Sequence, residues 1–391
     1  VGRPSGFYDV AEAAQPNLGI VIDFAVAIKC FGVACSYLTV VANSMVDVVG
    51  PSQGFVSTRE FWVLMAAIAA VPPTFLRKMD KLRFTSIAAL VCIAFIILLI
   101  VIFTTGALNP CSKPLAVSGA STCGSEIDVL PSHGAAPFLN KISTFVFAYT
   151  CHQNIFSLTN EMYDPRPARI NGSIAVSCAS AMLVYILVSY CGYLTFGNDV
   201  KSDILQSYPV TPIVTVARIA ISIVVIFSYP LQAHPSRLSI MSIVNFCGER
   251  CCPSCCGGST DDEERSAKLS TGTPALEENT AHAAVTCKFG PTFGGSVSPD
   301  TSMHYLITTV YISLSFLVAI TVTDLGLILS VVGALGSTTI CYILPGYCFW
   351  RLRPEGASPT KIILAAALCV TGCIVMPLAL TLAIMSAAGA V

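Results

Sequence analysis

The chain has 391 residues, of which 54% are hydrophobic and only 11% are charged, and its formal net charge is −1. Soluble domains carry about 25% charged residues, so this composition excludes an ordinary soluble protein and indicates a protein embedded in the lipid bilayer. The small net charge offers no basic surface for nucleic acid.

Apolar runs that are long enough to cross a bilayer recur between residues 20 and 388, which we take as one transmembrane domain. They predict an all-α membrane protein with about nine transmembrane helices. The expected spans are 20–45, 59–76, 84–105, 138–161, 171–196, 211–233, 303–323, 325–349 and 361–388. The sixth span is expected to break near Pro230, because proline removes a helical hydrogen bond.

Three other segments are set apart by composition. Residues 1–19 precede the first span, residues 106–137 are rich in glycine, serine and proline, and residues 246–302 are polar without periodicity. The last of these is expected to be a flexible loop.

Basic residues recur in the loops that follow the second, fourth, sixth and eighth spans, for example Arg351 and Arg353 after the eighth. Basic loops face the cytoplasm, so residues 1–19 and 246–302 are expected there and 106–137 on the opposite side. Cys111 and Cys123 then lie in an oxidising compartment, where we expect them to form a disulfide.

The fourth span, 138–161, has apolar halves on either side of a polar centre. That centre consists of Tyr149, Thr150, Cys151, His152, Gln153 and Asn154. Transporters use such interrupted helices near the middle of the membrane to hold substrate and ions. The alternative is an unbroken helix that packs its polar side against neighbouring helices, with Thr150 and Asn154 hydrogen-bonded across the interface.

Ionisable groups inside spans are costly and are therefore functional candidates. Lys29 lies well inside the first span, and His152 lies at the centre of the fourth. His152 titrates near neutral pH and suits a coupling proton, or it stays neutral and hydrogen-bonded within the bundle. Arg218 lies nearer the outer end of the sixth span, where its side chain is expected to extend to the interface.

The sequence contains no paired metal ligands, no phosphate-binding glycine loop and no nucleophile motif of the GxSxG type. These absences predict that the protein is not an enzyme. They also predict that it needs no metal and no cofactor.

Five stretches in chain order resemble the amino acid/auxin permease family. The stretch FVFAYTCHQNIFSLTNEM resembles the family's sixth helix, and GVACSYLTVV resembles its third. The stretches YCGYLTFGNDVKSDIL, ARIAISIVVIFSYPLQAHPSR and GALGSTTICYILPGY resemble its seventh, eighth and tenth helices.

The resemblance implies a LeuT-like, inverted-repeat bundle of eleven helices. This chain would hold family helices three to eleven, with the first two missing. In sodium-coupled relatives a hydroxyl residue before the eighth-helix proline contributes to an ion site, and this position matches Ser228. Lys29, His152 and Ser228 are therefore candidates for the coupling ion, and residues 149–154 are candidates for binding substrate.

The expected function is secondary active transport of amino acids by alternating access, driven by a proton or sodium gradient, in the plasma membrane or the vacuolar or lysosomal membrane. Two alternatives stay open. One is an amino acid sensor that signals through the 246–302 loop. The other is a transporter of a related amine such as a polyamine.

Overall fold

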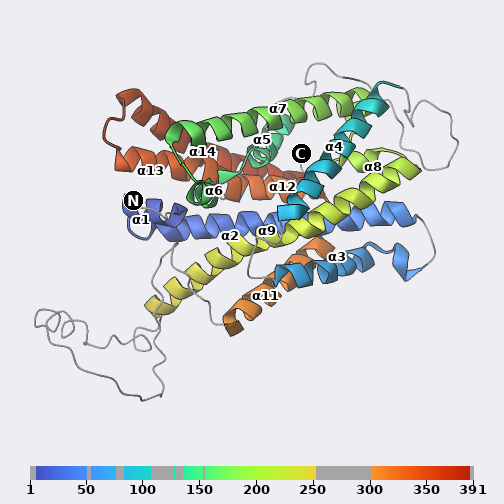
Figure 1. Cartoon of the computed structure of the whole chain (residues 1–391), viewed down its shortest axis with the longest axis horizontal. Coiled ribbons are helices and arrows are strands. Elements are labelled where there is room, and N and C mark those ends of the chain that lie inside the picture. The colour runs from blue at the N-terminus through green and yellow to red at the C-terminus, as the bar shows by residue number, and fades with distance from the viewer. Residues whose placement is uncertain are drawn as a thin grey trace, which may run out of the picture.

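The structure is a computed structural model that describes residues 6–50, 54–75, 83–106, 127, 135–152, 155–251 and 301–387. Within these residues every regular element is a helix (Figure 1). The α-helices are α1 (Phe7–Ala14), α2 (Leu18–Val49), α3 (Arg59–Thr74), α4 (Arg83–Thr104), α5 (Ala135–Ala148), α6 (Ile155–Glu161), α7 (Pro167–Phe196), α8 (Ile204–Ser207), α9 (Pro212–Cys251), α11 (Thr301–Thr321), α12 (Leu325–Val332), α13 (Leu344–Leu352) and α14 (Pro359–Ala387).

Seven helical stretches in the described part are long and apolar enough to cross a membrane. They are α2, α4, α7, α9, α11, the continuous stretch from α12 to α13, and α14. The span expected at 59–76 is the 16-residue α3. The span expected at 138–161 is divided into α5 and α6, and neither piece is as long as a full span.

Helix α2 is the centre of the molecule. Its 32 residues extend over about 48 Å at 1.5 Å per residue, and more than half of them are buried. Figure 1 shows α2 running through the middle, with α9 crossing it, α3 and α11 on one side, and α12 and α14 on the other. A helix that is apolar on all sides is expected in such a position, because all its faces meet other helices.

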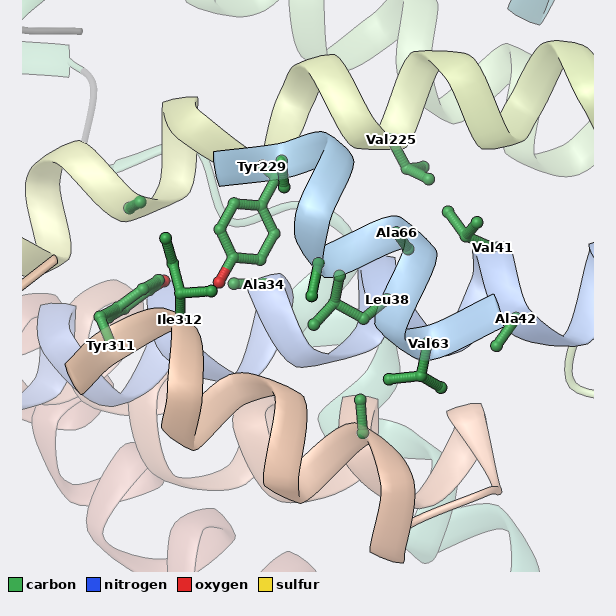
Figure 2. Close-up of a cluster of buried hydrophobic side chains, with 14 residues drawn as sticks. Ala34, Leu38, Val41, Ala42, Val63, Ala66, Val225, Tyr229, Tyr311 and Ile312 are labelled. Carbon is green, nitrogen blue, oxygen red and sulfur yellow. The ribbon is translucent and has the colours of Figure 1, made fainter. Parts of the chain in front are cut away.

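One side of α2 forms the main core with α3, α9 and α11 (Figure 2). Leu38 of α2 and Val63 of α3 are fully buried there, and the alanines of α3 bring its backbone close to α2. The Tyr229 hydroxyl of α9 and Ser315 Oγ of α11 are 2.6 Å apart, so this core also contains a buried hydrogen bond between helices.

The other side of α2 meets an irregular part of the stretch 325–352. Between α12 and α13 the chain forms two π-helical turns, Gly333–Ser337 and Thr339–Ile343. A Cβ added at Gly333 would lie 2.1 Å from the carbonyl oxygen of Ser143 in α5, so only glycine permits this approach. π-helical turns are often found at functional sites, and these two lie beside the interruption between α5 and α6.

The structure corrects two expectations about the sixth span. No break occurs near Pro230, because α9 continues through Pro230 and Pro235 to Cys251. A transmembrane helix tolerates proline because neighbouring helices and side chains satisfy the backbone groups that proline leaves without a partner. Residues 246–251 therefore belong to a helix and not to the expected flexible loop, whose remaining residues up to 300 lie outside the described part.

The amino-terminal segment contains a short helix. Residues 7–14 form α1, which packs on α2, and the ring of Phe7 lies edge-on to that of Phe156 in α6 with centroids 4.7 Å apart. The segment before the first long helix thus contacts the second half of the interrupted span.

Candidate functional site

The polar centre of the interrupted span lies where α5 ends. Thr150 closes that helix, because its amide donates to the Phe147 carbonyl (3.0 Å) and its hydroxyl donates to the Val146 carbonyl (2.6 Å). Cys151 has no helical conformation, His152 has 3₁₀-helical geometry, and the next α-helix, α6, begins at Ile155. The structure therefore contains the break, and the alternative of an unbroken helix with one polar side is wrong.

Lys29 of α2 extends into this break. Its Nζ donates to the backbone carbonyl of Thr150 at 3.2 Å, and the residue is only 3% exposed. The backbone carbonyls at a helix carboxyl end carry partial negative charge, which an ammonium group stabilises. Two residues that the sequence marked separately, 121 positions apart, are thus brought into direct contact.

Cys341 of the second π-helical turn joins the same group. Its thiol donates to Thr150 Oγ1 at 3.3 Å, and its Sγ lies 3.2 Å from His152 Nδ1. The direction of the second hydrogen bond depends on the tautomer of the imidazole. The site is therefore built from three separate parts of the chain: α2, the break, and the π-helical segment.

Tyr149 lies at the side of the break toward α7. Its ring meets that of Tyr185 edge-on, with centroids 5.3 Å apart, and the Tyr185 hydroxyl donates to the Ala148 carbonyl at 2.9 Å. Together with Lys29, Tyr185 occupies backbone carbonyls at the carboxyl end of α5.

The structure does not bring Ser228 to this group. Its hydroxyl donates to the Val224 carbonyl one turn earlier in α9 (2.8 Å), a contact that lies within the helix. Gln153 and Asn154 lie outside the described residues, and so do Cys111 and Cys123 with their expected disulfide. Within the part of the chain that the structure describes, no three histidine, cysteine or acidic side chains form a metal-binding group.

Sequence reasoning missed two residues, Cys341 in this group and Asp23 elsewhere on α2. Cys341 gave no signal, because it is one of 18 cysteines and lies 191 positions from Thr150. Asp23 gave a clear signal, a carboxylate a few residues inside an apolar span. It is 5% exposed and faces Ser239 and Ser242 of α9.

Arg218 corrects another expectation. It does not extend to the interface, since it is 1% exposed and its Nη2 lies 3.2 Å from Asp47 Oδ2. The same nitrogen donates to the carbonyls of Leu205 and Tyr208, at 3.0 and 3.1 Å. The loop that contains α8 folds over this end of α9 and supplies acceptors for Nη2, whereas Nε and Nη1 are buried without a hydrogen-bond partner.

The family-model comparison identifies the chain. Residues 3–389 match the model described as transmembrane amino acid transporter protein. The chain belongs to this family. The match confirms the resemblance seen in the sequence. It begins at residue 3 and gives no support to the expected loss of two family helices.

Individual relatives agree with the family match. Vacuolar amino acid transporter 6 of Saccharomyces cerevisiae is 33% identical over 363 residues, which cover 90% of this chain and 77% of that protein. Vacuolar amino acid transporter 5 of Schizosaccharomyces pombe is 29% identical over 97% of this chain and 79% of its own. Human sodium-coupled neutral amino acid transporter 7 is 24% identical over 86% of this chain and 63% of its own.

The protein is therefore a transmembrane amino acid transporter and not an enzyme. Its interrupted span, its buried lysine and its π-helical turns lie within the part that matches the family model. Which ion drives this transporter is a separate question.

Proposed function

We propose that this transporter couples amino acid movement to a proton gradient across the vacuolar membrane, with Lys29 as the coupling group and residues 149–154 as the substrate site. The observation that carries the proposal is the contact between Lys29 Nζ and the Thr150 carbonyl. Vacuolar location is supported by the names of the two fungal relatives.

The substrate site follows from the break. The backbone at Thr150 and Cys151 is not helical, so the amide and carbonyl of Cys151 can bind the carboxylate or ammonium of an amino acid. The carbonyls of Ala148 and Thr150 have donors of their own, Tyr185 and Lys29. His152, held beside Cys341, contributes a side chain at the same place.

Coupling follows from the chemistry of lysine. A buried ammonium group can lose its proton, whereas a guanidinium cannot. Protonated Lys29 attracts the carboxyl end of α5 and fastens the interrupted span to α2. Loss of the proton weakens that attraction and releases the span. In a LeuT-like inverted repeat one helix bundle moves against another during alternating access. Release of the contact between Lys29 and Thr150 permits that movement.

Sodium coupling is the second candidate. The human relative is named a sodium-coupled transporter, and Ser228 keeps an oxygen lone pair after donating to Val224. An ammonium group at Thr150 favours the proton, because the position at the helix end that would attract a metal cation is already taken by a cation of the chain.

Purified protein in proteoliposomes distinguishes the two. A panel of radiolabelled amino acids is presented with either an imposed pH gradient or an imposed sodium gradient. We expect the pH gradient to drive accumulation in sodium-free buffer, with movement of protons that a pH-sensitive dye reports. Accumulation driven only by sodium would overturn proton coupling and leave amino acid transport intact.

A further inference from the structure

A second buried ionisable group lies on α2, away from the break. Asp23 is six residues before Lys29, which is about 9 Å along a helix. The two side chains face different neighbours, since Lys29 reaches α5 and Asp23 faces α9. Asp23 is 5% exposed, and carboxylates buried within spanning helices are rare and mark ion pathways.

The surroundings of Asp23 are polar but uncharged. The hydroxyls of Ser239 and Ser242 hydrogen-bond to its carboxyl group, and its Oδ2 is buried without a hydrogen-bond partner. An isolated ionised carboxylate is costly away from water, and the hydroxyls of two serines do not neutralise it. A carboxyl group in this setting is stable when it carries a proton.

The charged and titratable groups on the neighbouring helices have other contacts. On α9, Arg237 donates to the Thr74 carbonyl and lies 3.2 Å from His234 Nδ1. On α1, Asp9 accepts from the Gly6 amide and Glu12 accepts from the Asn17 amide.

Hydroxyl groups continue from Asp23 along the interface of α2. Ser236, one turn before Ser239 in α9, donates to the Ala27 carbonyl at 3.2 Å. The Tyr311 hydroxyl of α11 lies close to Ser236 and donates to the Cys30 carbonyl at 3.1 Å. Each hydroxyl carries one proton, and Ser236 and Tyr311 donate theirs to the backbone of α2. Polar groups therefore line α2 from Asp23 to Cys30, the residue next to Lys29.

We propose that Asp23 is a second proton-binding site of the transporter, at which the coupling proton is exchanged with the side of the membrane where α2 begins. The site is the Asp23 carboxyl with Ser239 and Ser242 of α9. The inference rests on the proposed proton coupling and adds the place where the proton enters or leaves. By the distribution of basic loops, that side is the cytoplasm.

The test uses the full-length chain in proteoliposomes and the variant Asp23→Asn, which keeps the shape of the side chain but cannot exchange a proton. Two activities are compared: accumulation driven by a pH gradient, and counterflow of labelled for unlabelled amino acid at equal pH. We expect Asp23→Asn to lose accumulation at least tenfold while its counterflow stays within about twofold of wild type. Asp23→Glu, which restores a titratable group, should recover accumulation.

Two results would overturn the inference. One is Asp23→Asn that accumulates substrate as wild type does, and the other is loss of counterflow together with accumulation, which would make Asp23 structural. Infrared difference spectra give a readout that does not depend on transport. A band of a protonated carboxyl group should be present in wild type, respond to pH, and be missing in Asp23→Asn. If only a sodium gradient drove accumulation by the wild-type protein, the proposed proton coupling itself would be wrong.

Discussion

Gly336 lies directly against Lys29. A Cβ added at Gly336 would be 2.6 Å from Lys29 Cβ and 3.1 Å from the Ala25 carbonyl oxygen. The π-helical turn that contains Gly336 therefore packs against the backbone of α2 at the point where the lysine departs toward the break.

We expect Gly336→Ala to force the π-helical turn Gly333–Ser337 away from α2 and to displace Lys29 from Thr150. Overpacking of this kind costs about 1–3 kcal/mol of stability. The unfolding temperature in detergent should fall and gradient-driven uptake should be lost. Gly172→Ala is the matched control, because a Cβ there meets nothing within 4 Å. Equal behaviour of the two variants would contradict the close approach.

Cys341 joins the π-helical segment to the break through its thiol, which contacts Thr150 and His152. Cys341→Ala removes these contacts, whereas Cys341→Ser keeps a hydrogen-bonding group of similar size. One neutral hydrogen bond contributes about 0.5–1.5 kcal/mol, so Cys341→Ala should raise the apparent KM for substrate about two- to tenfold. The serine variant should stay close to wild type. An alanine variant with an unchanged apparent KM would remove Cys341 from the site.

Arg218 holds the loop around α8 to the end of α9. Arg218→Ala leaves the carbonyls of Leu205 and Tyr208 without their donor and Asp47 without its counter-charge, which we expect to cost about 1–3 kcal/mol. Asp47→Asn should cost less, because the Asp47 side chain is 37% exposed and solvent screens the pair. Thermal unfolding in detergent measures both, and an Arg218→Ala variant as stable as Asp47→Asn would contradict this ranking.

Asp203 lies in the loop outside the spans, and burial raises the pKa of its carboxyl group above the ordinary value. Hydrogen bonds from the Leu205 amide and the Gln206 side chain and the charge of Arg218 oppose that shift only in part. The folded protein therefore binds this proton more tightly than the unfolded chain does. Its contribution to stability is complete below the ordinary aspartate pKa of about 3.9 and is lost as the pH rises through the raised value.

Asp203→Asn cannot titrate at this position. We therefore expect the stability of wild type relative to Asp203→Asn to fall as the pH rises from about 4 to about 7. Unfolding temperatures of both proteins over this range provide the measurement. A difference that stays constant or rises with pH would show that burial does not control this carboxyl group.

Sequence reasoning located the break and its polar residues because a polar centre within an apolar span has few explanations in a membrane. It also marked Lys29 as a charge inside a span. The contact between Lys29 and Thr150 could not be predicted, because it depends on how α2 and α5 pack, and local patterns carry no information about that packing.

Other features depended on tertiary contacts in the same way. The π-helical turns, the first of which begins at Gly333, have no sequence pattern of their own. Glycine is required at this position because α5 packs against it, and the sequence does not reveal that contact. The expected break at Pro230 failed because packing around α9 overrides the local preference of proline. The acceptors of Arg218 come from the loop around α8, and its position near the end of a span does not reveal that contact.

The central claim is that Lys29 carries the coupling proton at the break, and Lys29→Met tests it most directly. In proteoliposomes that hold an imposed pH gradient, amino acid uptake and proton movement are recorded together, with counterflow at equal pH as the control for a folded transporter. We predict that Lys29→Met exchanges amino acids but neither accumulates them nor moves protons with them. Accumulation by Lys29→Met at the wild-type level, with protons moving alongside the substrate, would contradict the account.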